Sequence, residues 1–390
     1  MPGFHGEPVH PLRAVVDELE LPLVRPFSTS FGTEEARRIL LLTLEDADGV
    51  RGFSECVAGR DPYYSYESVP TVLEVLERYL LPSLAALGNE VTPPRFLQAA
   101  DRIRGHPMAK ALVEMALWDL SARRSKLPLQ KLLASGRPVR ERVEVGVSVG
   151  LASSPRELVR QLEEYAGQGY QRLKLKVEPG RDQDFVRAAR ESFPDSPLWI
   201  DANQAYAAKD VDALATLCRS ASLSVVEQPF GEDELLLHAS LAQELRGTPT
   251  LVCLDESVTS LGRFELALQE GAVGCLNVKP GRVGGLSRSL ELHDRAETAG
   301  VPVWCGGMLE TGIGRAHDLH LASLPGFRLP ADLSASDRYW KEDLIEPPFR
   351  LGPGSTLPVP TGDGIGVEPE EERLSKVRLA QRVLPLNQKL

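Results

Sequence analysis

From about Arg142 onward, short apolar segments alternate with amphipathic stretches at helical spacing. This rhythm restricts the fold strongly, because neighbouring parallel strands need crossover helices between them. Strands are expected at 143–149, 171–177, 198–202, 223–227, 251–255, 274–279, 301–304 and 327–333. Eight such units in about 200 residues predict an α/β fold of the parallel (β/α)8 barrel type. A doubly wound sheet is the main alternative, but no Gly-x-Gly-x-x-Gly follows the first strand.

The part of the chain before the barrel has a different rhythm. Residues 38–45 predict an apolar strand that pairs back with 50–57, and helical spacing follows at 68–87, 94–104 and 108–125. After about Trp340 the Pro- and Gly-rich tail is expected to return to this lobe. The expected division is therefore 1–137 for an α+β lobe, 138–339 for the barrel and 340–390 for the returning segment.

Composition excludes several classes of protein. The formal net charge is −11, and no basic stretch is present, so nucleic acid and anionic membranes are not expected partners. No apolar run approaches the length of a bilayer span, and residues 1–10 lack a signal peptide pattern. Five widely spaced cysteines without a Cys-x-x-Cys motif favour reduced thiols in a cytoplasmic protein.

Polar residues recur where each barrel strand ends. They follow one another from Lys176 at separations of 25, 26, 28 and 24 residues, about one βα unit each: Lys176, Asp201, Glu227, Asp255 and Lys279. Active sites of such barrels lie at the carboxyl ends of the strands. The series therefore predicts one site that combines lysines and carboxylates.

Lys174 and Lys176 alternate with apolar residues along one strand. Because side chains alternate across a strand, both ammonium groups are expected to point into the barrel. Each ammonium disfavours the charge of the other, so at least one pKa is expected to fall and give a base near neutral pH. An edge strand with solvated lysines is the alternative.

Asp201, Glu227 and Asp255 each end an apolar strand. Converging carboxylates repel one another unless a cation lies among them, and oxygen ligands without His or Cys select Mg²⁺, or Mn²⁺. The alternative is that each carboxylate caps a helix. Asn203 is expected to orient a ligand oxygen, and Glu256 to face away and support the ligands from behind.

Lys279 ends the sixth strand, across the ring from the strand of Lys176. Two amines on opposite faces of one carbon suit the removal and return of a proton, with the metal stabilising the enediolate formed from a carboxylate substrate. A solvated loop lysine is the alternative. Among weaker signals, Gly307 suggests close ligand approach and Glu310 a supporting role.

Together these residues resemble the enolase superfamily, in its muconate-lactonizing-enzyme subgroup. The resemblance covers nearly the whole chain and rests on Lys174-x-Lys176, Asp201-x-Asn203, Glu227-Gln228-Pro229, Leu254-Asp255-Glu256-Ser257 and Lys279-Pro280-Gly281. It implies that Lys176 and Lys279 are the acid/base pair, that Lys174 tunes Lys176, and that the three carboxylates bind the metal. It also implies that the α+β lobe caps the barrel.

Within this subgroup, Trp304 to Ala316 and Ser334 to Trp340 are similar to the N-succinylamino acid racemase / o-succinylbenzoate synthase family. Arg282 is the residue type of the racemising members, whereas the Asp-x-Asp motif of dipeptide epimerases is replaced by Asp332-Leu333-Ser334. The resemblance implies that the substrate is a small carboxylate, that particular residues of this chain bind it, and that the protein is a homo-oligomer. The substrate-binding residues expected are Phe27, Phe31, Asn203, Arg282, Gly307, Met308 and Glu310, and the two phenylalanines suggest an apolar portion of the substrate.

Four functions stay open. Racemisation of N-acylamino acids, N-succinylamino acids in particular, is favoured, and o-succinylbenzoate synthesis by syn dehydration rests on the same enediolate. A Schiff-base aldolase also suits a lysine on strand six, but the clustered carboxylates argue against it. A barrel that binds a metal or carboxylate without catalysis is the fourth, and the lysine pair argues against that.

Overall fold

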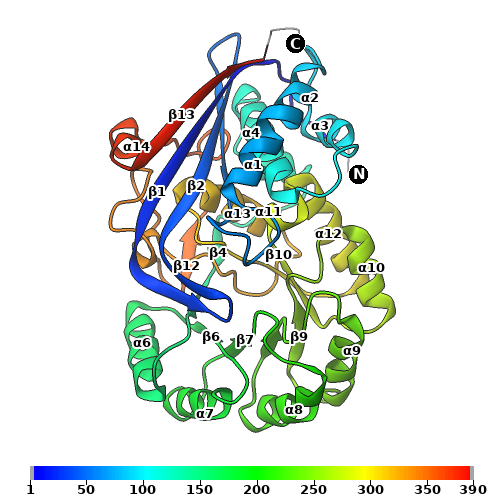
Figure 1. Ribbon diagram of the computed structural model, residues 1–390, viewed down its shortest axis with the longest axis vertical. Helices are drawn as coiled ribbons and strands as arrows, with labels where there is room; N and C mark the ends of the chain where they lie inside the picture. Colours follow the sequence, from blue (N-terminus) through cyan, green and yellow to red (C-terminus); the bar gives the residue numbers. More distant parts are fainter. Residues whose placement is uncertain (1–3, 387–390) are drawn as a thin grey trace.

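The computed structural model describes residues 4–386 and begins with an antiparallel sheet. Its order is β13-β1-β2-β3, and Figure 1 shows the long β1–β2 hairpin reaching down to the barrel. The C-terminal strand pairs with β1 along almost its whole length. The chain therefore returns to its beginning, although the domain boundaries at 137/138 and 339/340 stay predictions. The bounds are β1 Pro11–Thr29, β2 Gly32–Asp46, β3 Arg51–Cys56 and β13 Arg378–Pro385.

Helices cover one face of this sheet. The segment expected at 68–87 begins as α1 and continues through a π-helical turn, η1, into α2, where Pro82 has no N–H to donate to the preceding turn. Helix α4 is apolar on nearly all sides, and it is buried between the sheet and the barrel. The bounds are α1 Val69–Val75, η1 Leu76–Leu80, α2 Leu81–Ala85, α3 Pro93–Ala100, α4 Pro107–Arg124 and α5 Leu129–Ala134.

The barrel sheet is parallel and has the order β11-β10-β9-β8-β7-β6-β5. Strands that follow one another in sequence are neighbours throughout, whereas a doubly wound sheet would reverse direction at a switch point. The (β/α) barrel prediction is therefore confirmed. The strands are β5 Gly146–Val149, β6 Arg172–Lys176, β7 Leu198–Asp201, β8 Val225–Glu227, β9 Leu251–Leu254, β10 Cys275–Val278 and β11 Val303–Cys305.

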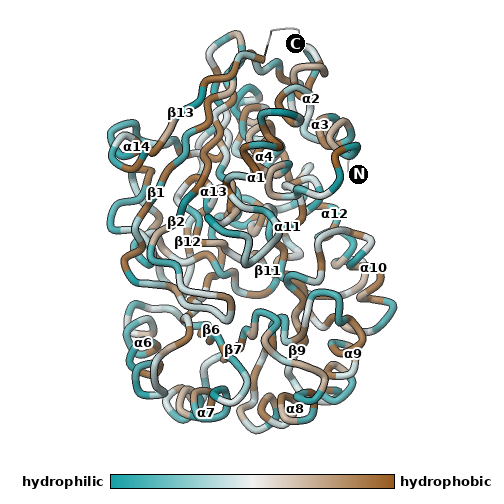
Figure 2. The backbone as a smooth tube through the Cα atoms, in the orientation of Figure 1, coloured by the Kyte–Doolittle hydropathy of each residue, from teal (hydrophilic) through white to brown (hydrophobic). Residues whose placement is uncertain are grey.

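Amphipathic helices connect these strands on the outside of the barrel, and in Figure 2 α7 and α8 alternate between hydrophilic and hydrophobic segments. Their bounds are α6 Pro155–Gln168, α7 Asp182–Ser192, η2 Ala208–Asp210, α8 Val211–Ser220, α9 Leu235–Glu244, α10 Leu261–Gln269, α11 Pro280–Val283, α12 Leu286–Ala299 and α13 Gly312–Ala322. Among residues 4–386, no helix combines the length and apolarity that a bilayer crossing requires.

The eighth strand expected at 327–333 is wrong as a regular strand. This segment makes isolated parallel bridges, Phe327 with Val303 and Ala331 with Val145, so it still joins the two edges of the sheet. Pro330 lies between these bridges and has no N–H for a continuous ladder. The first expected strand is also split, into β4 Arg142–Glu144 and β5, and β4 pairs with β12 Thr356–Pro358. Between the barrel and β13 lie η3 Ser336–Arg338 and α14 Glu371–Val377.

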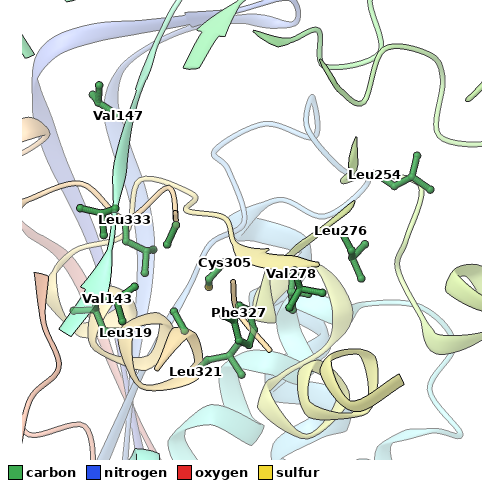
Figure 3. Packing of buried hydrophobic residues seen from close by; sticks show 14 of the residues in the cluster. Val143, Val147, Leu254, Leu276, Val278, Cys305, Leu319, Leu321, Phe327 and Leu333 are labelled. Atoms are coloured by element: carbon green, nitrogen blue, oxygen red, sulfur yellow. The ribbon is translucent and has the colours of Figure 1, made fainter. Parts of the chain in front are cut away.

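Buried apolar side chains form one core between the strands and the outer helices. Figure 3 shows part of this cluster, with labelled residues from the barrel strands, from α13 and from the closing segment around Phe327. Inside the barrel, Trp199 and Trp304 meet edge to face at 5.3 Å between ring centroids. Because Trp199 lies two residues before Asp201 on β7, this aromatic layer forms the floor beneath the carboxyl ends of the strands.

Two buried glutamates of the N-terminal part bind the amino ends of barrel helices. Glu114 on α4 accepts the N–H groups of Leu286 and Ser287, each at 2.8 Å, at the start of α12. Glu55 on β3 accepts those of Thr311 at 3.1 Å and Gly314 at 3.2 Å, at the start of α13. A helix N-terminus favours a carboxylate, although burial raises the pKa of Glu55 to about 7. The two contacts fix the loops after β10 and β11 against the N-terminal lobe.

We expect Glu114→Ala to lower the free energy of unfolding by about 2–4 kcal/mol, because two buried backbone N–H donors lose their acceptor. The indole of Trp118 also loses the nearer of its two acceptors, at 2.7 Å, and keeps the hydroxyl of Ser287 at 3.1 Å. Urea unfolding would measure the change. Glu74→Ala, which removes an exposed carboxylate paired with Arg78, is the control and should cost less than about 0.5 kcal/mol. Equal losses in both variants would contradict the anchoring role.

Candidate active site

Strand β6 places Lys174 and Lys176 on the inner face of the barrel, while the leucines beside them pack outward. The ammonium of Lys174 lies 2.7 Å from the carboxylate of Glu227 and 3.2 Å from that of Asp201. The ammonium of Lys176 lies 2.6 Å from Asp201. Lys174 is also 4.8 Å from the ring centroid of Trp304, on the floor of the barrel. The alternative of an edge strand with solvated lysines is therefore excluded.

The three carboxylates lie side by side at the same end of the sheet. Asp201 and Glu227 are the last residues of β7 and β8 and are paired in register, and Asp255 directly follows β9. Their exposed fractions are 2%, 0% and 0%. The amide of Asn277, on β10, donates to Glu227 at 2.7 Å. None of the three is the N-cap of a helix, so the capping alternative does not describe them.

Lys279 directly follows β10, and its ammonium lies 2.7 Å from Asp255. In the sheet order, β10 is separated from β6 by β9, β8 and β7. Two strands so far apart in a closed barrel of eight positions face each other across the interior. Lys176 and Lys279 therefore approach the barrel mouth from opposite sides, with the three carboxylates on the strands between them.

Buried carboxylates raise the pKa values of two lysines of the site. Burial lowers the pKa of Lys174, but the charges of Asp332, Glu227 and Asp201 outweigh it and raise the pKa well above its ordinary value. The fall in pKa predicted for the pair of Lys174 and Lys176 therefore does not appear at Lys174. Burial and Asp255 act on the pKa of Lys279 in the same opposed way, and again the pKa is raised.

The three carboxylates have the donor chemistry that a divalent cation prefers. Burial and the charge of Asp201 raise the pKa of Glu227 to about 7. The raised pKa shows that the ionised form of Glu227 is destabilised by its buried position and its negative neighbour. The donors are all oxygens, are buried, and come from adjacent strands. A hard cation such as Mg²⁺ prefers such ligands and relieves their repulsion.

Two family models together cover most of the chain. Residues 157–373 match the model described as enolase C-terminal domain-like. Residues 13–134 match the N-terminal domain of mandelate racemase / muconate lactonizing enzyme. The chain belongs to the enolase superfamily.

Two names recur among relatives that are 38–44% identical to this chain. The N-succinylamino acid racemase of Thermus thermophilus is 44% identical over 94% of this chain and 96% of its own length. The o-succinylbenzoate synthase of Geobacillus stearothermophilus is 40% identical over 93% of this chain and 94% of its own. A solved enolase-superfamily structure from Listeria innocua superposes with a TM-score of 0.91 at 36% identity, covering 97% of this chain and all of that one. The resemblance drawn from the sequence motifs is confirmed.

Asn203 and Glu256 extend the site on the Lys176 side of this superfamily fold. The amide oxygen of Asn203 accepts a hydrogen bond from Lys176, and its nitrogen donates to Glu256 at 3.2 Å. Glu256 therefore faces the mouth, not away from it as expected. Burial and the charge of Asp255 raise the pKa of Glu256 to about 8.

Arg282 is fully engaged by protein groups. Its guanidinium binds Asp255 and the carbonyl of Asn277, and its Nε donates to the carbonyl of Val258 at 3.1 Å. All three nitrogens are thereby used. The structure favours a role for Arg282 through Asp255 over the expected direct contact with substrate.

Gly307, Met308 and Glu310 lie in the loop after β11. A side chain at Gly307 would meet the carbonyl of Asp332 at 2.6 Å, so this close approach requires glycine. The carboxylate of Glu310 is buried and accepts the N–H of Met308 at 2.6 Å. Glu310 thus shapes the loop from within.

Phe27 and Phe31 flank the tip of the β1–β2 hairpin. The half-buried ring of Phe27 is 5.9 Å from the guanidinium carbon of Arg338, and that of Phe31 meets Tyr64 edge to face at 6.1 Å. The hairpin is tied to the barrel, since Ser30 donates to the carbonyl of Asn203 at 3.0 Å. Both phenylalanines therefore border the mouth.

Sequence reasoning missed three residues around the lysines. Tyr64 lies in the N-terminal lobe, yet its hydroxyl is 3.2 Å from the ammonium of Lys279 and 3.3 Å from Asp255. Asp332 lies 2.9 Å from Lys174. Asn277, which binds Glu227, precedes Lys279 by two residues within an apolar strand, so the same alternation that found Lys174 could have found it.

Proposed function

We propose that this enolase-superfamily enzyme racemises N-acylamino acids, and N-succinylamino acids in particular. The observation that carries the proposal is the placement of Lys176 and Lys279 on opposite sides of the barrel, with Asp201, Glu227 and Asp255 on the strands between. The name of the Thermus thermophilus relative supports the choice of substrate.

Each lysine serves one face of the substrate α-carbon. The amine of one lysine accepts the α-proton, the C–H electron pair moves toward the substrate carboxylate, and the ammonium of the other lysine returns a proton to the opposite face. Burial of the carboxylates and of Lys279 limits the access of water to the reacting carbon, and the hairpin tip contacts this mouth at Asn203. In the reverse direction the two lysines exchange roles.

The proposed metal ligands are Asp201, Glu227 and Asp255, and the proposed ion is Mg²⁺ or Mn²⁺. When bound, the ion supplies positive charge that stabilises the substrate carboxylate as it gains electron density. The carboxylate of Asp255 also raises the pKa of Lys279. Sharing that carboxylate with a cation favours the loss of the Lys279 proton, which a base requires.

Exchange of the α-proton in D₂O tests the reaction directly. With Mg²⁺ present, both enantiomers of an N-succinylamino acid are expected to lose the Cα–¹H signal and to converge on a racemic mixture, because each enantiomer presents its proton to one lysine. Proton NMR and chiral chromatography measure the two processes. An absence of exchange with both enantiomers would contradict the proposed function.

Synthesis of o-succinylbenzoate is the second candidate function, since relatives 38–41% identical carry that name. In this syn dehydration one lysine would act as base and the other would stabilise the intermediate as a cation. Comparing kcat/KM for dehydration and for racemisation in one preparation decides which activity is larger.

The cellular location and the oligomeric state of the protein are also proposals. All five cysteines lie within the described residues and are buried and unpaired, which supports a reducing, cytoplasmic location. A homo-oligomer is proposed from the family resemblance alone, and light scattering in solution tests it.

A further inference from the structure

Arg338 is a half-buried cation at the rim of the barrel, and no carboxylate of residues 4–386 forms an ion pair with it, although its charge helps to lower the pKa of Glu164 on α6. Among residues 4–386 its one hydrogen bond runs from Nη2 to the carbonyl of Ser148 at 3.1 Å, and its Nε is buried without a partner. Other arginines of this rim are neutralised: Arg25 lies 2.6 Å from Glu164, and Arg181 lies 2.9 Å from Glu178. A guanidinium left without a carboxylate in such a place calls for an anion from outside the chain.

Aromatic rings hold the Arg338 guanidinium in place. Its central carbon is 4.8 Å from the ring centroid of Tyr165, 5.0 Å from Tyr339 and 5.9 Å from Phe27. Rings that pack on a guanidinium stabilise its charge and fix its plane. The remaining N–H groups then lie at the edge of that plane, in the fork geometry that binds a carboxylate through two hydrogen bonds.

Arg338 lies beside the active site described above. Its bond to Ser148 places it at the carboxyl end of β5, next to β6, and Ser148 is paired in register with Lys174. On the hairpin, Phe27 contacts Arg338, whereas Ser30 contacts Asn203, the partner of Lys176. Figure 1 shows this hairpin above β6 and β7.

The length of a short acyl chain agrees with the position of Arg338. Arg338 donates to the carbonyl of Ser148, and the strand of Ser148 lies beside that of Lys174 and Lys176, about 5 Å away in the sheet. From the α-carbon of an N-succinylamino acid to its terminal carboxylate is about 6 Å when extended, and a hydrogen bond adds about 3 Å. Together these lengths span about two strand spacings, which agrees with a substrate that extends from the lysines of β6 to Arg338.

We infer that Arg338 binds the terminal carboxylate of the substrate's acyl group and so selects N-acylamino acids whose acyl chain ends in a carboxylate. The inference rests on the proposed function for the identity of the substrate. It assigns Arg338 a specificity role that is separate from proton transfer, because its contacts do not include Lys176 or Lys279.

The first test compares N-succinyl and N-acetyl forms of one amino acid with Arg338→Met. We expect kcat/KM for the N-succinyl form to fall about 10- to 100-fold, mainly through KM, because charge-assisted hydrogen bonds are lost. The N-acetyl form has no terminal carboxylate, so its kcat/KM should change less than about threefold. Arg350→Met, which removes an exposed guanidinium bound to Asp337, is the matched control and should change neither.

The second test is independent of the reaction. N-succinylglycine and N-acetylglycine have no stereocentre at the α-carbon, so calorimetry with the Mg²⁺-loaded protein measures binding alone. The wild type should bind N-succinylglycine about 10- to 100-fold more tightly, and Arg338→Met should remove that preference. The inference is overturned if the wild type binds the two compounds equally. It is also overturned if Arg338→Met weakens the binding of both compounds by the same factor, because Arg338 would then only support the structure of the hairpin. Failure of the proposed function instead appears as absent D₂O exchange in the wild type.

Discussion

Lys279→Ala is expected to abolish racemisation while leaving proton exchange with one enantiomer. Racemisation in both directions should fall by at least about a thousandfold, because only one face of the α-carbon keeps an amine within reach. Lys176, on the opposite side of the barrel, can still remove and return the proton that points toward it. Proton NMR in D₂O should therefore show loss of the α-proton from one enantiomer without formation of the other.

The corresponding substitution of the other lysine makes this test more stringent. Lys176→Ala should show the same loss of racemisation with the opposite enantiomer still exchanging, since the two lysines serve opposite faces. Lys341→Ala removes an exposed lysine and should leave the rate unchanged. A Lys279→Ala protein that racemises at the wild-type rate, or single variants that exchange the same enantiomer, would contradict the two-lysine scheme.

Local sequence rules were enough for the barrel and for the residues at its strand ends. Alternation places Lys174 and Lys176 on one face, and the βα repeat places the three carboxylates on adjacent strands. The same rules failed at 327–333, where the apolar run suggested a strand but Pro330 interrupts the ladder. A strand pattern describes side-chain burial and does not by itself ensure backbone pairing.

Local sequence rules could not predict the residues that reach the site from the other domain. Tyr64 reaches Lys279 over 215 positions of sequence, and only the packing of the N-terminal lobe on the barrel brings them together. Arg282 could be identified as important by resemblance, but its three protein partners could not. The raised pKa of Lys174 could not be predicted for the same reason, because the neighbouring Lys176 is visible in the sequence whereas the contacts with Glu227 and Asp332 are not.

Glu227→Gln is expected to lower kcat/KM by at least about a thousandfold and to weaken Mg²⁺ binding, because the middle one of the three proposed oxygen ligands loses its charge. Glu227 is fully buried, and its carboxylate accepts hydrogen bonds from Lys174 and Asn277, both at 2.7 Å. Glutamine has nearly the same shape but cannot offset the ammonium of Lys174. Calorimetry with Mg²⁺ and Mn²⁺ measures the loss of binding separately from the loss of activity.

Glu232→Gln is the matched control, because Glu232 lies in the loop after the same strand and is exposed. It should keep wild-type metal affinity and activity. EDTA should abolish the activity of the wild type, and added Mg²⁺ should restore it, since the ion supplies charge that no described side chain replaces. If Glu227→Gln binds Mg²⁺ as the wild type does, the ligand assignment is wrong. If the wild type also remains active in EDTA, metal-assisted proton transfer is wrong as a whole, and trapping with borohydride then tests a Schiff base at Lys279.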